Sequence, residues 1–256
     1  QTLLQDLVQE VKNHGSIHLY TEAEILGSEK KNGYYRTRIR HENEEKSLSH
    51  GALILATGGR EIAPKGYLYG ENDRVITQRQ LEKMLHQKDE RLKDIRSVVM
   101  IQCVGSRDEE HPYCSRICCN HAVKNGLKLK EINPRVNIYV LYRDVRTYGF
   151  YETYYHEARG KGIIFIRYDL DHKPEVTRKN GGLQVSVFDP AMVSRVNLPA
   201  DRVVLSTGIE PNSHQELAKI FDVDLNPDGF FLEANPKSAP LDSVDRGKFF
   251  VGLCHS

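Results

Sequence analysis

The sequence predicts an α/β fold in which a domain with a parallel sheet is inserted between two parts of another domain. Two observations predict it. The first is an apolar strand at 97–105, a helix at 118–132 and a strand at 136–144, an order that predicts a parallel strand pair joined by a crossover helix. The second is a pair of apolar strands that end in Thr-Gly, near Gly58 and Gly208, and bracket this unit.

The bracketing sets the expected domain boundaries. Residues 1–71 and 196–256 are expected to form an incomplete outer domain, and residues 72–195 an inserted domain with a doubly wound sheet. A chain of 256 residues is long enough for one or two domains. Its 36 Lys and Arg against 35 Asp and Glu give a formal charge of +1, so no global field attracts nucleic acid or an anionic membrane. The apolar runs fall far short of the roughly 18 residues of a membrane span.

Periodicity and turn residues predict the elements of the first part of the outer domain. In order, they are a helix at 2–14 and strands at 16–20, 25–30, 34–41 and 46–57. The helix is predicted because leucines and valines recur on one helical face. The second and third strands flank Asn32-Gly33, a pair that accepts the positive φ angles of a hairpin turn.

The inserted domain is expected to add further helices and strands around the β-α-β unit. These are helices at 77–87 and 151–160 and strands at 163–168 and 183–188. Thr77 and Gln80 have the spacing of a capping box, which predicts the start of the first helix. The glycines after Asn180 predict a turn before the last strand.

Four of the five cysteines lie within seventeen residues, at Cys103, Cys114, Cys118 and Cys119. A tight cluster in an otherwise cysteine-poor chain is typical of a metal site or a redox centre, whereas a secreted disulfide scaffold spreads its cysteines. The pattern therefore favours a reducing, cytoplasmic compartment.

The spacing predicts that the four thiols meet at one site. Cys103 ends a strand, and the other three are expected at the start of the next helix, where Cys114 and Cys118 share a face as i and i+4. The helix N-terminus favours thiolates, and Arg107 and Arg116 add positive charge that suits a net-negative iron–sulfur cluster.

Alternatives to an iron–sulfur site remain open. Structural zinc is one, with His111 or His121 as a further ligand, although zinc prefers paired knuckles of two to four residues in both halves of a site. A disulfide or unligated buried thiols are another. A thioredoxin-like dithiol is disfavoured because Cys114 and Cys118 form C-x-x-x-C instead of C-x-x-C.

The β-α-β unit lacks the glycine loop of a dinucleotide site. A G-x-G-x-x-G turn lets a pyrophosphate approach a helix N-terminus, but here the loop holds a single glycine, Gly105, within "QCVGSRDEEHPYCSR". We interpret this β-α-β unit as a nucleotide-binding unit that has been converted to bind a metal cluster. Arg143 and Arg146 follow the second strand, where related enzymes read a ribose phosphate, and are interpreted here as surface arginines.

The run "VMIQCVGSRDEEHPYCSRICCNHAVKNGLKLKE" closely resembles the thioredoxin-reductase-like module in the A-subunit of heterodisulfide reductase, an iron–sulfur flavoprotein of methanogens, sulfate reducers and other anaerobes. "ALILATGG", "VVLSTGIEPN" and "FFVGLCHS" stand in the order of the family's remaining flavin-domain motifs, so the resemblance covers most of the chain. It implies a Rossmann-like FAD/NAD(P)-binding fold, with an incomplete FAD domain interrupted by the nucleotide-binding-like domain.

The resemblance also implies cofactors, sites and partners. The residues matching the family's cluster ligands, expected to hold a [4Fe-4S] cluster, are Cys103, Cys114, Cys118 and Cys119. Those expected to line the flavin groove are Thr57, Gly58, Gly59, Gly208, Ile209 and Gly252. The intact protein is expected to be an oxidoreductase subunit that takes part in electron bifurcation or confurcation with other heterodisulfide-reductase-type, hydrogenase or dehydrogenase subunits. No side chain is expected to act in acid–base or nucleophilic catalysis, and this chain alone is expected to be inactive.

Three departures from the family pattern concern the cofactors. The G-x-G-x-x-G loop for FAD is absent and is expected upstream of Gln1, where the chain opens without methionine. The chain ends at Ser256, inside the last flavin motif, so we expect a piece of a longer protein that does not retain FAD. The segment "RIRHENEEKSLSH" is too short for the ferredoxin-like insertion of many members. Cys254 is expected outside the cluster, as a small buried side chain.

Overall fold

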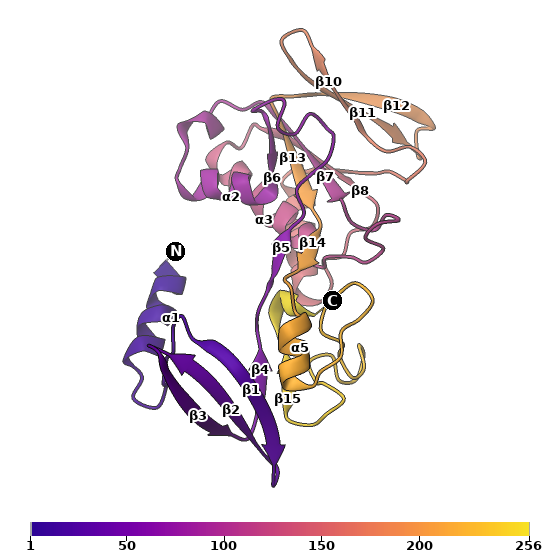
Figure 1. Ribbon diagram of the computed structural model, residues 1–256. Coiled ribbons are helices and arrows are strands. Elements are labelled where there is room, and N and C mark those ends of the chain that lie inside the picture. The colour runs from indigo at the N-terminus through magenta and orange to yellow at the C-terminus, as the bar shows by residue number, and fades with distance from the viewer. Residues whose placement is uncertain (1, 256) are drawn as a thin grey trace. The chain divides into compact units, whose positions relative to one another are not determined.

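A computed structural model describes residues 2–255 of the chain and divides it into two compact units (Figure 1). The first unit contains the residues up to Gly58 and those from Pro211 onward, and the second contains Gly59–Glu210. The sequence-based boundaries near 71 and 196 differ from these. The reason is that one strand beyond the expected insertion, at 202–207, joins the parallel sheet of the second unit, and that the residues from 59 onward also belong to this unit.

The first unit has two helices, a three-stranded antiparallel sheet and a parallel strand pair. Its elements are α1 (Thr2–Asn13), β1 (Glu24–Lys31), β2 (Tyr34–His41), β3 (Glu44–His50), β4 (Leu53–Leu55), α5 (Gln215–Phe221), β15 (Lys248–Phe250) and the 3-10 turn η3 (Gly252–Cys254). The β1–β2 hairpin turns at Asn32 and Gly33 with φ of 53° and 81°, as the sequence predicts.

Two strand predictions for this unit are wrong. Residues 16–20 form no strand. The expected strand at 46–57 is broken into β3 and β4, because β3 continues the antiparallel sheet whereas β4 pairs in parallel with β15, which lies almost 200 residues later. The Leu53 N–H donates to the Gly247 carbonyl at 2.8 Å and anchors this second pairing. The core around it contains Leu55, Phe231 and Phe250.

The second unit is built on a five-stranded parallel sheet of order β6-β13-β7-β8-β9. The strands are β6 (Val75–Thr77), β13 (Arg202–Thr207), β7 (Ser97–Val104), β8 (Asn137–Tyr142) and β9 (Ile164–Arg167). Helices α2 (Gln78–His86), α3 (Cys118–Ile132) and α4 (Glu152–Gly160) connect them, with short 3-10 turns η1 (Glu90–Leu92) and η2 (Gly149–Tyr151). The β-α-β unit and the capping box of Thr77 and Gln80 are confirmed.

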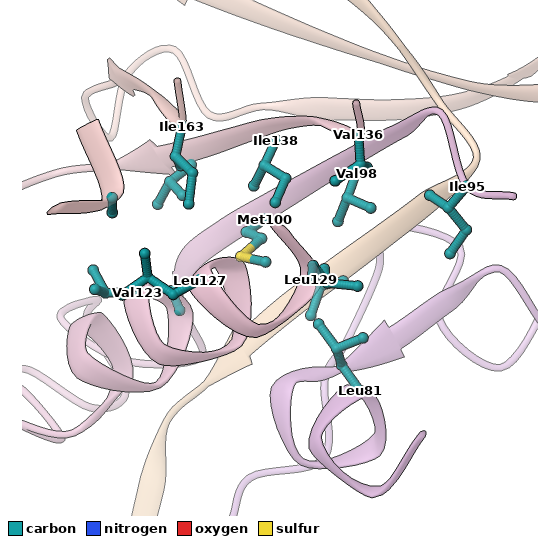
Figure 2. Close-up of a cluster of buried hydrophobic side chains, with 14 of the residues drawn as sticks. Leu81, Ile95, Val98, Met100, Val123, Leu127, Leu129, Val136, Ile138 and Ile163 are labelled. Atoms are coloured by element: carbon teal, nitrogen blue, oxygen red, sulfur yellow. The ribbon is translucent and has the colours of Figure 1, made fainter. Parts of the chain in front are cut away.

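The two faces of this sheet are covered differently. Helices α2, α3 and α4 pack on one face, where Leu81, Val123 and Leu129 meet Val98 and Met100 (Figure 2). The other face packs on an antiparallel sheet of β10 (Glu175–Lys179), β11 (Gly182–Asp189) and β12 (Ser194–Ala200). The expectation of a doubly wound sheet is therefore wrong, because the second covering layer is made of strands instead of helices.

A short strand pair, β5 (Gly59–Glu61) with β14 (Ile209–Pro211), lies where the chain passes between the units. None of the helices within residues 2–255 combines the length and the apolar character that crossing a membrane requires.

Candidate metal centre

The four clustered cysteines lie at the carboxyl end of β7 and in the loop that leads to α3. Cys103 is near the end of β7, and Cys118 and Cys119 are the first residues of α3. Cys114 lies in the loop, so the expectation that it shares a helical face with Cys118 is wrong. The physical reason is Arg116, whose φ of 60° lies in the left-handed region and cannot continue into a right-handed helix.

A closed turn returns the loop toward the strand it leaves. The N–H of Arg107 donates to the carbonyl of Tyr113 at 3.1 Å, and the N–H of Asp108 to that of His111 at 3.2 Å. The Asp108 carboxylate also accepts from the His111 N–H at 2.8 Å. These bonds close the excursion between Arg107 and Tyr113, which brings Cys114 back to the strand end.

The loop is also tied to the end of β13. The Gly208 N–H donates to the Val104 carbonyl at 2.8 Å, and the Ile209 N–H donates to the hydroxyl of the buried Ser115 at 2.8 Å. The Cys118 thiol donates to the Thr207 carbonyl at 3.4 Å. The loop between β7 and α3 (residues 105–117), called here the cysteine loop, is thus held by the end of β13, the strand next to β7.

The thiols are close enough for their charges to interact. Burial raises the pKa of the Cys103 thiol, the Arg107 guanidinium opposes that rise, and the charges of Cys119 and Cys114 add to it. Burial also raises the pKa of the Cys118 thiol far above its ordinary value, with further rises from the other three cysteines. Thiolates at this site therefore need a compensating positive charge. A bound metal ion supplies that charge, and its thiol ligands lose their protons when they bind it.

The side chains are not gathered on one point. Within residues 2–255, no group of three or more Cys, His, Asp or Glu has the arrangement of a metal site. The expectation of a common point for the four sulfurs is not met, because Cys118 and Cys119 turn to backbone carbonyls, the latter to Asp144 at 3.7 Å. His111 packs edge-on against Tyr113, and His121 lies in a groove between α3 and α4.

The four cysteine sulfurs nevertheless are the kind of ligand that a thiolate-bound metal group requires. The four cysteines lie at the end of β7, in the following loop and at the start of α3, the Arg107 charge acts on the thiols of Cys103 and Cys119, and sulfur is the ligand that iron–sulfur clusters use. Two polar atoms beside them, Arg107 Nη1 and Thr207 Oγ1, are buried without a hydrogen-bond partner among residues 2–255. A group that accepts hydrogen bonds at this place would satisfy them.

The segment after β8 holds the cysteine loop. Arg143 donates a hydrogen bond to the Arg107 carbonyl, and the Arg107 guanidinium donates to Asp144 at 2.6 Å. Arg146 lies 4.0 Å from Asp144, and its backbone N–H bonds to the Cys119 sulfur. Arg143 is half-buried and contacts the cysteine loop, a contact that the interpretation as a surface arginine did not include. The sequence analysis did not identify Asp144 as a site residue. Its position at the end of the predicted strand at 136–144, the partner of the strand that carries Cys103, could have indicated it.

A cavity of about 810 Å³ in the second unit borders the loop. Its lining includes Cys103, Gly105, His111, Tyr67 and Tyr168. The Tyr168 hydroxyl is fixed, because it donates to the Gln102 carbonyl at 2.6 Å. Cys103 is therefore the cysteine of the four that lies on this cavity wall.

The six residues assigned to a flavin groove are divided between the two units. Thr57, Gly58 and Gly252 belong to the first unit, and Gly59, Gly208 and Ile209 to the second. Gly58 and Gly252 have φ of 71° and 76° with no atom within 4 Å of the place a Cβ would occupy. Both positions therefore leave the backbone approachable.

Cys254 lies apart from the cluster within the first unit. Its fully buried thiol donates to the Leu55 and Val251 carbonyls at 3.2 and 3.1 Å. Near it, Thr57 Oγ1 lies 3.4 Å from the Nδ1 atom of His214, whose ring stacks on Phe231. These contacts make Cys254 a core residue of that unit.

Comparison with known proteins finds related sequences across most of the chain. The A-subunit of the H(2)/formate:CoB-CoM heterodisulfide,ferredoxin reductase of Methanococcus maripaludis is 38% identical over 230 residues, which are 82% of this chain and 34% of that protein. The iron-sulfur A-subunit of the CoB--CoM heterodisulfide reductase of Methanocaldococcus jannaschii has the same identity and coverage. The chain thus spans about a third of the length of these curated relatives. No protein-family model matches it.

Solved structures of the same fold include thioredoxin reductases. That of T. acidophilum has a TM-score of 0.56 and 15% identity, and covers 100% of this chain and 72% of its own. That of Lactococcus lactis has a TM-score of 0.54 and 16% identity with the same coverage. This likeness shows a thioredoxin-reductase-like FAD/NAD(P)-binding fold, as the sequence predicts.

Proposed function

The chain belongs to the family of heterodisulfide reductase A-subunits, and from that premise we propose that it is the electron-transfer module of such a protein, with a [4Fe-4S] cluster held by its four clustered cysteines. The observation that carries the proposal is the cysteine loop. Four thiols stand where a dinucleotide-binding unit has its glycine loop, at the carboxyl end of a parallel sheet. The charges of Cys103, Cys114 and Cys119 act on the Cys118 thiol, and the Arg107 charge acts on Cys103 and Cys119.

When bound, an iron–sulfur cluster supplies one-electron transfer without proton chemistry from the protein. The residues of this chain would bind it and set its surroundings. Cys103, Cys114, Cys118 and Cys119 are the proposed ligands. The turn at 107–113 and the bonds to β13 would hold these ligands near one another, because they fix the loop backbone at both of its ends.

FAD and partner subunits belong to the proposal for the whole protein. Thr57, Gly58, Gly59, Gly208, Ile209 and Gly252 are the proposed flavin-side residues. The relatives' names describe subunits of complexes that act on heterodisulfide and, in some cases, ferredoxin. We extend this to electron bifurcation or confurcation between the flavin, the cluster and other heterodisulfide-reductase-type, hydrogenase or dehydrogenase subunits, in the cytoplasm of an anaerobe.

A zinc-stapled structural or interaction domain is the competing function, since four cysteines are also a ligand set of structural zinc. A pyridine-nucleotide disulfide oxidoreductase is less well supported, because its dithiol needs a lowered thiol pKa, whereas burial raises the pKa of Cys103, Cys118 and Cys119.

The test is metal analysis of the anaerobically purified chain. Iron, acid-labile sulfide and zinc are measured per chain, and the dithionite-reduced protein is examined by electron paramagnetic resonance. About four irons and four sulfides with the resonance of a reduced cluster would support the proposal. One zinc per chain without sulfide would overturn it in favour of the structural site.

A further inference from the structure

Arg107 is fixed by contacts on its backbone and its side chain. Its N–H donates to the Tyr113 carbonyl at 3.1 Å, and its carbonyl accepts a hydrogen bond from Arg143. Its guanidinium donates through Nη2 to Asp144 at 2.6 Å, and only 16% of the side chain is exposed. The residue adopts a φ of 58°, which this loop conformation stabilises. The guanidinium therefore has one fixed place beside the cysteines.

The other end of that guanidinium is left unpaired. Nη1 is buried and has no hydrogen-bond partner among residues 2–255. A guanidinium is always charged and its donors are arranged in a rigid planar fork, so fixing Nη2 on Asp144 also fixes the direction of Nη1. The guanidinium also makes a side-chain hydrogen bond with Cys103, so it lies directly beside a proposed ligand. Arg107 thus presents a positive charge and an unused N–H close to a proposed ligand.

We propose that Arg107 is a positioning and tuning residue whose charge and free Nη1–H, oriented by Asp144, raise the reduction potential of the cluster bound by this loop. The inference rests on the proposed function. Cluster potentials depend on net charge and on hydrogen bonds to the sulfurs. Reduction adds one negative charge to the cluster, so a fixed positive charge nearby stabilises the reduced form more than the oxidised form.

The experiment is a redox titration of the full chain after anaerobic reconstitution with ferrous iron and sulfide. Wild type is compared with Arg107→Gln, which removes the charge, and Arg107→Lys, which keeps it. Arg135→Gln is the matched control, because Arg135 is an exposed arginine in the turn before β8, at the opposite end of that strand from Asp144. Iron and sulfide contents are measured for every sample.

We expect Arg107→Gln to lower the reduced-to-oxidised ratio at a fixed potential by about tenfold, equivalent to about 59 mV for one electron. Arg107→Lys should lower it less, and Arg135→Gln should leave it unchanged. Equal potentials for wild type and Arg107→Gln at equal iron content would overturn the inference and leave the proposed function standing. Absence of iron and sulfide from wild type would overturn both.

A variant that fails to load the cluster still gives an answer. If Arg107→Gln takes up no iron, the Arg107→Lys variant decides between the outcomes. A reduction potential close to that of wild type supports the role of the charge, whereas a tenfold drop in the reduced-to-oxidised ratio contradicts it. Loss of the cluster from both variants, with Arg135→Gln fully loaded, would make Arg107 a requirement for assembly and would overturn the tuning role.

Discussion

The carbonyl oxygen of Gly105 occupies the space next to the α-carbon of Gly208. A Cβ at position 208 would lie 2.4 Å from that oxygen and 2.9 Å from the Cδ1 atom of Ile62. The end of β13 therefore packs directly on the backbone of the cysteine loop. The close approach of the Gly105 carbonyl requires glycine at position 208, and this requirement does not depend on a flavin.

Gly208→Ala is expected to destabilise the chain by about 1–3 kcal/mol, because an added methyl group in a close-packed place forces the backbone to shift. Urea unfolding measures the change. The matched control is Gly160→Ala at the end of α4, where no atom lies within 4 Å of the added methyl and alanine is the better helix former. Equal losses in both variants would show that the contact with Gly105 is not the cause.

The capping box of α2 gives a second prediction. The Thr77 hydroxyl accepts from the Gln80 N–H at 3.3 Å, and the Thr77 N–H donates to the Gln80 side chain at 2.7 Å. Thr77→Ala should cost about 1 kcal/mol of unfolding free energy. Because the two bonds form one reciprocal pair, the double variant with Gln80→Ala should lose less than the sum of the single losses. Strict additivity in thermal unfolding would contradict this interpretation.

The carboxylate of Asp245 gives a pH dependence. Its hydrogen bond from Lys30, together with that from the buried Lys248, lowers its pKa to about 2. A carboxylate whose pKa is lower in the folded state stabilises the fold above the ordinary pKa of 3.8 and loses this contribution as the pH falls toward 2.

Asp245→Asn should therefore flatten the loss of stability between about pH 4 and pH 2, relative to wild type. The difference should stay under about 1 kcal/mol, since water screens a carboxylate that is 42% exposed. Asp171→Asn, at an exposed carboxylate of the other unit, serves as the control. A wild-type and an Asp245→Asn profile of the same slope in this window would rule out the contribution.

The purified chain is expected to carry no FAD. No G-x-G-x-x-G sequence occurs in its 256 residues, and dinucleotide affinity depends on a pyrophosphate at the N-terminus of a helix. Flavin absorbance of the supernatant after heat denaturation measures it. Stoichiometric FAD would mean that another part of the chain, such as the segment of Arg143 and Arg146, binds the phosphates.

Local patterns allowed several elements of both units to be predicted. The β-α-β order, the hairpin at Asn32-Gly33 and the Thr77 capping box each depend on residues close in the sequence. The β4–β15 pair and the β10–β12 layer were missed because they depend on which distant strand supplies a partner. Cys114 was placed on the helix because spacing alone does not reveal the left-handed backbone of Arg116.

The assignment of the four cysteines as cluster ligands stays a prediction. Sequence spacing singled out these cysteines and the charge of Arg107, and in the structure Cys103 interacts with Arg107, Cys114 and Cys119. The contacts of Arg143 and Asp144 with the loop could not be foreseen, since they depend on how the end of β8 meets the turn at 107–113.

The most direct test of the central claim is iron content in cysteine variants after anaerobic reconstitution. Cys118→Ser should lower iron and acid-labile sulfide per chain, because Cys118 is a proposed ligand. Cys254→Ser should keep the wild-type amounts, because that thiol is buried among Leu55 and Val251 in the other unit. Equal iron in Cys118→Ser and wild type, or equal losses in both variants, would contradict the assignment of the four cysteines as cluster ligands.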